Sequence, residues 1–370
     1  MSTGLYLHIP FCSAKCCYCN FYSRPLEEEA ADRYVNALIR GMERQPFGRI
    51  SVDTIYLGGG TPGILGAGRL SRILEGAARF FQIEEGAEIT LEANPESINY
   101  NEISDLYKSG YNRISFGVQS SCPEELTALG RRHGPEEAKR AIIAAHSAGF
   151  RHISADLMLA IPRQTEESLR ESVDFLARLP LDHISAYLLK LEEGTPLYSS
   201  ADAALCPDEE GEADLYLLCC ELLEKAGFAQ YEISNFAKPG GQSGHNLKYW
   251  CCEPYLGIGP SAHSYMEGRR FFFPSDLDSF LAAENPFRLI VEDGAGGDFE
   301  EYAMLRLRLR EGLDLAECGR LFPGEDITAV SERAELLIQR GLVRREGDNL
   351  SLTREGFLLS NAVTAKLLFG

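Results

Sequence analysis

The chain has 370 residues, of which 45% are hydrophobic, and this is the composition of a folded protein with a large core. Its 55 acidic against 36 basic residues give a formal net charge of -19, which repels phosphate backbones and anionic lipids and so excludes nucleic acid and membrane surfaces as general partners. No apolar run approaches the roughly 18 residues that span a bilayer and no basic leader is visible, so we expect a cytoplasmic protein without a membrane span.

Two kinds of segment alternate along the first half of the chain. Short runs rich in β-branched residues are predicted as buried strands at residues 5–9, 54–57, 89–91, 113–118, 152–159 and 183–189. Segments with helical periodicity lie between them at residues 30–44, 68–81, 136–148 and 166–179. Repeated strand and helix units form parallel sheets. We therefore predict an α/β fold, a partial (β/α)6 TIM-like barrel.

Polar and glycine-rich residues follow three of these strands directly. The segments are GGGTP at 58–62, EANP at 92–95, and Gln119 with Ser120. In parallel barrels the loops at the carboxyl ends of the strands form the active site, so these residues predict a ligand site at one mouth. The alternative is that they are ordinary turn residues. Because such residues follow the same end of successive strands, we favour a ligand site.

The second half predicts a smaller companion domain. A helix is expected at 208–226 and a strand at 230–235, followed by an irregular glycine-rich and aromatic region at 239–263 that is typical of a binding loop. The segment 292–298 is the best linker in the chain. We place the domains at 1–285 and 286–370.

The tail predicts a winged-helix-like order. Helices are expected at 299–311, 328–340 and 354–368, with a short hairpin around 347–349 before the last of them. Residues 299–370 hold 10 basic against 12 acidic residues and no basic stripe. Such a module is expected to pack or dock against protein rather than bind DNA.

Three of the 11 cysteines form a compact motif after the first predicted strand. Cys12, Cys16 and Cys19 have the spacing C-x3-C-x2-C, and an odd cysteine count in a chain without a secretory signal favours reduced thiols or metal ligands over disulfides. Three thiolates on a four-iron cluster leave one iron open to a small molecule. The alternative is a zinc knuckle with Cys17 as its fourth ligand.

The sequence LYLHIPFC at 5–12, running into the cysteine motif, resembles the radical S-adenosylmethionine (SAM) superfamily and, within it, the oxygen-independent coproporphyrinogen oxidase group. The resemblance implies a [4Fe-4S] cluster on the three cysteines and a SAM molecule on its open iron. Carried over position by position, it implies cofactor contacts by Tyr6, Tyr18, Gly59, Gly60, Thr61, Glu92, Gln119, Arg131 and Asp156. One departure is Lys190, which stands where the oxidase has a small residue.

A second signature lies in the aromatic region. His245, Tyr249 and Trp250 form the pattern HNxxYW, which resembles the haem chaperones of the same group. A neutral imidazole or a tyrosinate can ligate haem iron and an indole can lie on the porphyrin, so these three residues are predicted haem contacts. The alternative is a hydrogen-bonded structural histidine.

The resemblance thus implies a haem chaperone that delivers haem to haem-dependent proteins. An oxygen-independent coproporphyrinogen III oxidase is the enzymatic alternative, and a radical enzyme acting on another tetrapyrrole or methyl acceptor is a third. Only five residues precede Tyr6, and Asn20 occupies the position of the oxidase's fourth motif cysteine, so we expect the chaperone. The sequence leaves the oligomeric state open.

Overall fold

Six neighbouring parallel strands form the core of the protein. In the computed structural model, which describes residues 2–370, a twelve-stranded sheet has the order β14-β13-β12-β11-β1-β4-β5-β6-β7-β8-β10-β9. The six parallel strands predicted from sequence are adjacent in it: β1 (Thr3–Ile9), β4 (Ser51–Gly59), β5 (Gln82–Ala93), β6 (Arg113–Gln119), β7 (His152–Leu159) and β8 (His183–Leu188). The partial (β/α)6 barrel is therefore confirmed.

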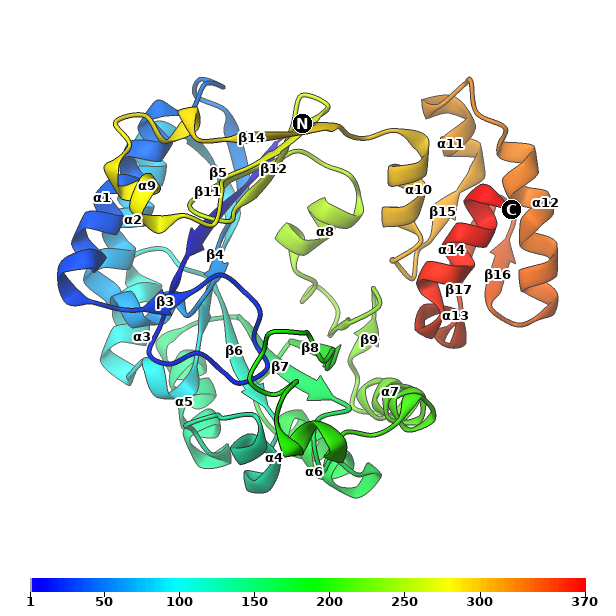
Figure 1. The fold of residues 1–370 in the computed structure, drawn as a ribbon, viewed down its shortest axis with the longest axis horizontal. Helices are drawn as coiled ribbons and strands as arrows, with labels where there is room; N and C mark the ends of the chain where they lie inside the picture. Colours follow the sequence, from blue (N-terminus) through cyan, green and yellow to red (C-terminus); the bar gives the residue numbers. More distant parts are fainter. Residues whose placement is uncertain (1) are drawn as a thin grey trace.

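Helices cover the outer face of the curved sheet (Figure 1). They are α1 (Glu28–Arg44), α2 (Ala67–Phe80), α3 (Tyr100–Lys108), α4 (Pro123–Ala128), α5 (Pro135–Ala148), α6 (Glu166–Ala177) and α7 (Glu209–Lys225). α1 shows how the sequence does this, because Tyr34, Val35, Leu38 and Met42 recur at helical spacing and are fully buried. Burying each such side chain stabilises the fold by about 1.5–3 kcal/mol.

The irregular region predicted at 239–263 is in fact ordered. It contains α8 (Gly244–Trp250) and β11 (Tyr255–Ile258), which pairs in parallel with β1 and extends the sheet beyond the barrel strands. The strand predicted at 230–235 is also interrupted, since a turn separates β9 (Ala229–Gln230) from β10 (Asn235–Ala237). Elements of two to seven residues are too short to show a clear hydrophobic period, which explains both errors.

Antiparallel strands complete the sheet next to β11. They are β12 (His263–Met266), β13 (Arg269–Phe272) and β14 (Val291–Ala295), with α9 (Leu277–Ala282) in the connection. β14 occupies most of the segment predicted as a linker, and all five of its residues are exposed. An edge strand without a buried face has no alternating pattern that could identify it. Two short strands, β2 (Phe11–Cys12) and β3 (Arg24–Pro25), pair separately at the cysteine loop.

The C-terminal module packs beside the open side of the barrel (Figure 1). It comprises α10 (Phe299–Arg306), β15 (Leu313–Asp314), α11 (Leu315–Leu321), α12 (Ile327–Gln339), the hairpin β16 (Val343–Glu346) and β17 (Asn349–Leu352), α13 (Arg354–Leu358) and α14 (Ser360–Phe369). Main-chain hydrogen bonds attach it to the core, from Arg310 N to the Tyr231 carbonyl (3.0 Å) and from Ile233 N to the Arg308 carbonyl (3.2 Å). No helix in residues 2–370 is long and apolar enough to cross a membrane.

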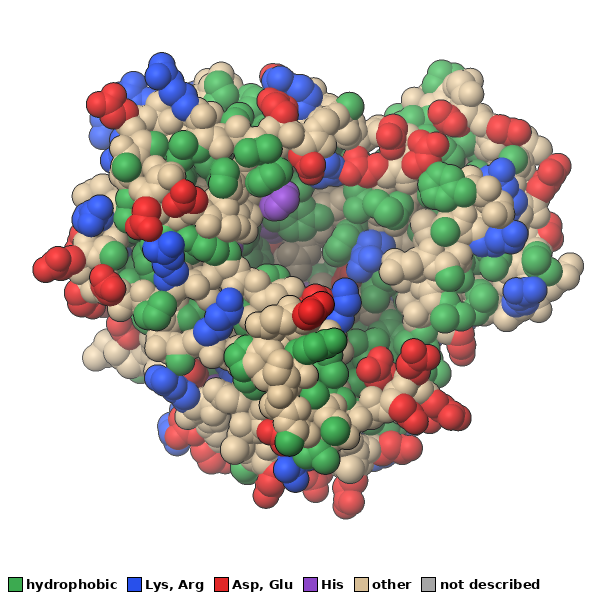
Figure 2. Space-filling view, viewed as in Figure 1, with side chains coloured by type: hydrophobic (Ala, Val, Ile, Leu, Met, Phe, Trp, Pro, Cys, Tyr) green, Lys and Arg blue, Asp and Glu red, His purple; other side chains and the backbone are tan. Residues whose placement is uncertain are grey.

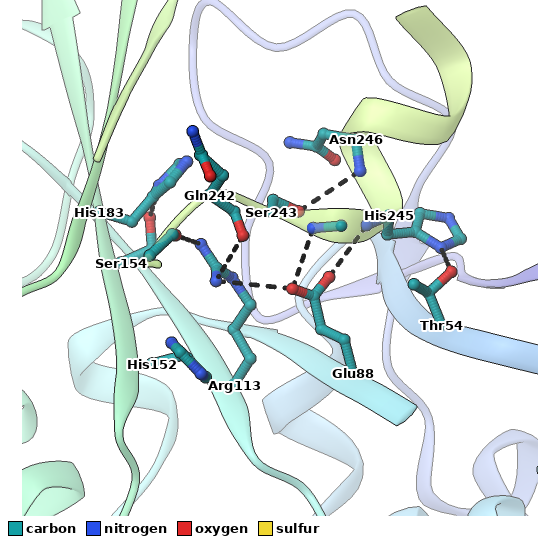
Figure 3. Close-up of polar contacts among 12 residues, drawn as sticks. Thr54, Glu88, Arg113, His152, Ser154, His183, Gln242, Ser243, His245 and Asn246 are labelled. Carbon is teal, nitrogen blue, oxygen red and sulfur yellow. Dashed lines mark hydrogen bonds and ion pairs between the residues drawn. The ribbon is translucent and has the colours of Figure 1, made fainter. Parts of the chain in front are cut away.

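Charged residues hold the start of α8 at the bottom of the barrel (Figure 3). The Glu88 carboxylate on β5 accepts hydrogen bonds from the backbone N–H groups of Gly244 and His245, both at 3.0 Å. Arg113, the first residue of β6, lies 3.5 Å from that carboxylate, is 2% exposed, and donates to the Gly241 carbonyl at 2.8 Å. α8 is thereby anchored to strands that are distant in sequence.

The Arg113→Met substitution tests this anchor. It leaves Glu88 without its cation inside the fold, so the free energy of unfolding is expected to fall by about 3 kcal/mol in urea denaturation. Arg178→Met is the control, because Arg178 is exposed and its loss should cost less than about 0.5 kcal/mol. A R113M variant as stable as the control would contradict the anchoring role.

Candidate cofactor site

A cavity of about 500 Å³ lies inside the barrel and opens at the carboxyl ends of its strands. In the space-filling view this face is hollowed at its centre, between the barrel and the C-terminal module (Figure 2). Most of the cluster and SAM residues predicted from sequence line the cavity together: Cys12, Cys16, Cys19, Tyr18, Gly59, Gly60, Thr61, Glu92, Gln119, Arg131 and Asp156. The structure thus brings residues from six separate loops and strands to one place.

Main-chain contacts join the cysteine loop to the glycine loop. The N–H of Gly60 donates to the Ile9 carbonyl at 2.8 Å and that of Thr61 to the Phe11 carbonyl at 2.7 Å. A Cβ atom on Gly60 would lie 2.5 Å from the Phe11 carbonyl oxygen, closer than real side chains approach. Glycine is therefore required at position 60, and the loop after β4 lies directly against the one after β1.

Two hydrogen-bond donors face the thiols of the motif. The Thr61 hydroxyl donates to Cys12 Sγ at 3.6 Å, and Arg131 Nη1 donates to Cys16 Sγ at 3.4 Å. Both side chains can also donate to a thiolate, which is the form of cysteine that binds iron. Burial raises the pKa of the Cys19 thiol.

Cys17 points away from the other three thiols. Its thiol donates to the Ala128 carbonyl at 3.2 Å, it does not line the cavity, and burial raises its pKa. No group of three His, Cys, Asp or Glu side chains in the described part of the chain is arranged around a single ion. In an iron–sulfur cluster each thiolate binds a different iron, so its ligands need not converge on one point.

Two carboxyl groups lie on the inner wall of the cavity. Burial, together with the charge of Asp156, raises the pKa of Glu92 to about 7, although the Tyr56 hydroxyl donates to it at 2.6 Å. Burial also raises the pKa of Asp156 to about 6, against a hydrogen bond from Ser115 at 3.2 Å. Polar acceptors held at fixed positions in a cavity are suited to the hydroxyl groups of a ribose.

Polar groups without partners indicate that the cavity is shaped for a ligand. The Nε atom of Arg131 and the hydroxyl of Thr90 are buried and have no hydrogen-bond partner among residues 2–370. Gln119 adopts a left-handed backbone (φ 71°), a conformation that costs energy for a non-glycine residue and is concentrated at functional sites. These features, with the three thiols and the close glycine backbone, fit the donor set that a cluster and SAM require.

The sequence prediction missed several lining residues. Tyr56, Lys15 and Asn246 line the cavity without having been predicted, and so does Lys190, which was predicted only as a departure from the oxidase. Strand alternation could have identified Tyr56, because it lies two residues before Gly58 on the same face of β4. Asn246 could not have been found this way, since its position depends on how α8 docks.

Four predicted site residues do not line the cavity: Tyr6, His245, Tyr249 and Trp250. Tyr6 lies one layer behind it, stacked on Tyr56 with ring centroids 6.2 Å apart. The three residues predicted to contact haem are on α8. His245 and Tyr249 are hydrogen-bonded to each other, whereas the buried Nε1 of Trp250 has no hydrogen-bond partner in residues 2–370. Haem contact by these residues stays a prediction.

The imidazole of His245 is 1% exposed and both of its nitrogens are hydrogen-bonded. Nδ1 lies 2.8 Å from the Thr54 hydroxyl and Nε2 lies 2.8 Å from the Tyr249 hydroxyl. Burial, together with the Lys248 charge, lowers its pKa to about 3. Trp250 points instead toward the C-terminal module, where the Arg308 guanidinium lies 4.6 Å from the ring centroid. In this arrangement iron can reach the imidazole only if one of the hydrogen bonds breaks.

Comparisons with known proteins agree with this geometry. Residues 6–176 match the family model of the radical SAM superfamily, and residues 298–359 match that of the HemN C-terminal domain. The fold is that of coproporphyrinogen III oxidase (HemN) from Escherichia coli, with a TM-score of 0.85, 22% identity, and coverage of 100% of this chain and 90% of that one. The cavity and these matches define a radical SAM protein with a HemN-type C-terminal domain.

Curated relatives identify the family within this superfamily. The heme chaperone HemW of Mycobacterium tuberculosis is 37% identical over 376 residues, covering 99% of this chain and 94% of the relative. HemW of Escherichia coli is 34% identical over 384 residues, covering 97% and 96%. The chain belongs to the HemW family.

Exchanging neighbouring cysteines tests the cluster ligands. Cys16→Ser is expected to abolish most of the iron and sulfide bound after anaerobic reconstitution. The substitution removes one of the three predicted cluster ligands, the thiol beside Arg131. Cys17→Ser is the matched control and should bind as much iron as the wild type, since Cys17 faces Ala128. Loss of iron from the C17S variant to the same extent would contradict the assignment.

The raised pKa of the partly buried Glu92 carboxyl predicts a pH-dependent stability. Since its pKa is about 7 in the folded protein and lower when unfolded, its contribution is complete at low pH and is lost as the pH rises through 7. Between pH 5 and pH 8 the melting temperature of Glu92→Gln should therefore rise relative to wild type by roughly 2–4 °C.

Thermal unfolding of the exposed control Glu75→Gln should show no such pH-dependent difference. If the melting temperatures of E92Q and wild type differed by the same amount at both pH values, the pKa of Glu92 in the folded protein would be close to its usual value. That result would contradict the prediction.

Proposed function

We propose that this protein is a haem chaperone that binds haem and, with a [4Fe-4S] cluster and SAM, delivers it to haem-dependent proteins. The observation that carries the proposal is identity of 33–37% to curated heme chaperones over nearly the whole chain, including both domains. The likeness to HemN is below 25% identity and supports the fold alone. The oxidase alternative therefore has no independent support.

The proposed cofactor site follows from the cavity. Cys12, Cys16 and Cys19 would hold the cluster, and the close backbone of Gly59 and Gly60 would admit the amino and carboxylate groups of SAM. Glu92 and Asp156 offer acceptors for its ribose, with Tyr18, Thr61, Gln119 and Arg131 on the surrounding wall. When bound, the cluster supplies an electron that can cleave the sulfonium of SAM to an adenosyl radical.

The mouth of the cavity suits a flat molecule with an apolar face and anionic edges. Phe21 is 65% exposed and Leu188 36% exposed, and both line the opening. Lys15 and Lys190 line it as well, in a protein whose net charge is -19. Apolar side chains next to two cations are complementary to a porphyrin with two propionates, which supports haem as the ligand.

We also infer that the protein works in the cytoplasm, with haem-accepting proteins as its partners. All 11 cysteines are free thiols in the structure. A reducing compartment is where a protein with so many unpaired cysteines is expected.

A haem titration of the anaerobically reconstituted protein tests the function. We expect a saturable Soret band, followed by loss of that band as haem passes to an added apo-haem protein. Lys15→Glu with Lys190→Glu should weaken haem binding about tenfold or more, since two attractive charges become repulsive. The oxidase reaction is assayed in parallel with coproporphyrinogen III, SAM and reductant.

Absence of saturable haem binding by the wild type would contradict the chaperone function. So would sustained formation of protoporphyrinogen, because it would favour the oxidase. The double variant Lys108→Glu with Lys139→Glu makes the same change in net charge at exposed positions on α3 and α5, away from the cavity, and should bind haem like the wild type.

A further inference from the structure

The signature histidine contacts the wall of the cavity from behind. The ring of His245 stacks on that of Tyr56, with centroids 5.2 Å apart and an angle of 27° between the planes. Tyr56 separates His245 from the cavity, because Tyr56 lines it and His245 does not. The imidazole thus supports a residue of the site rather than facing a ligand.

Tyr56 in turn orients the carboxyl group of Glu92. The Tyr56 hydroxyl donates to Oε1 of Glu92 at 2.6 Å, while the Gly59 N–H donates to Oε2 at 3.2 Å. These two hydrogen bonds fix both oxygens, one from the tyrosine and one from the glycine loop. A change in the angle of the Tyr56 ring would therefore rotate the carboxyl group.

The position of the imidazole is itself strongly constrained. The Thr54 and Tyr249 hydroxyls engage its two nitrogens, so that ring rotation would cost two buried hydrogen bonds (Figure 3 shows the Thr54 contact). The ring also packs on β1, where a Cβ atom on Gly4 would lie 3.2 Å from Cε1 of His245. Lys248 anchors α8, because its ammonium lies 2.9 Å from the carboxylate of Asp53.

We propose that His245 is a positioning residue of the SAM site, which holds the Glu92 carboxyl toward the ribose of SAM through the stacked ring of Tyr56. This inference rests on the proposed function in one respect, that SAM occupies the cavity. It assigns the signature histidine a role that does not include ligation of haem.

A double-mutant cycle on SAM affinity tests the proposal. Dissociation constants are measured by equilibrium dialysis on the reconstituted protein for wild type, His245→Ala, Glu92→Gln and the double variant. We expect each single variant to bind SAM about tenfold more weakly. If His245 acts through Glu92, the double variant should bind within about twofold of E92Q, because the two effects are then not additive.

Several results would overturn the proposal. One is an H245A variant that binds SAM like the wild type. Another is a double variant whose loss is the product of the single losses, which indicates a general structural role. A third is loss of the Soret band in H245A with SAM affinity unchanged, which would make His245 a haem ligand. Failure of the wild type to bind SAM would instead refute the proposed cofactor site.

Controls separate positioning from loss of stability. Tyr111→Phe removes a buried hydrogen bond to the Leu70 carbonyl, away from the cavity, and should leave SAM affinity unchanged. His245→Phe keeps a ring against Tyr56 and is expected to recover most of the affinity. If H245A does not fold, Thr54→Val is measured instead, because it removes the hydrogen bond to Nδ1 of the imidazole. This variant should bind SAM about threefold more weakly than wild type, but should have no effect in the E92Q background.

Discussion

Direct backbone contact between the glycine loop and the cysteine loop is the constraint on which the rest of the site depends. The N–H groups of Gly60 and Thr61 donate to carbonyls on either side of Pro10, and no side chain would fit between them. The cysteines are thereby held next to the loops that follow the other parallel strands. Since those loops open at the same edge of the sheet, one cavity can present thiols, backbone donors and carboxyl groups together.

The polar wall of this cavity depends on support from outside it. Glu92 and Asp156 are partly buried carboxyl groups on the cavity wall, and Arg131 reaches from the side of the cluster loop to Asn94 at 2.8 Å and to the Gly117 carbonyl at 2.6 Å. Buried polar groups keep one orientation only when each is tied to further partners. α8 supplies such partners through its contact with Tyr56, and the same helix presents Trp250 to the C-terminal module.

Local pattern predicted the barrel and the cofactor cavity but not the docking of α8. β6 is fully buried and carries Ile114, Phe116 and Val118 at alternate positions, a pattern that the sequence shows directly, and the loops that follow such strands carried the site prediction. β11 has four residues and β14 is wholly exposed, so neither has a recognisable period. The burial of His245 depends on Gly4, Thr54 and Tyr56, which lie far from it in sequence, and no local pattern records that packing. The motif could therefore predict the residue's importance but not its partners.

The central claim is that three thiolates leave one iron of a cluster open to SAM in this cavity. Electron paramagnetic resonance of the reduced, reconstituted cluster, recorded before and after addition of SAM, tests it most directly. The account predicts that SAM shifts the g values of the cluster signal, because its amino and carboxylate groups become ligands of the open iron. A cluster signal that is unchanged at saturating SAM would contradict the account.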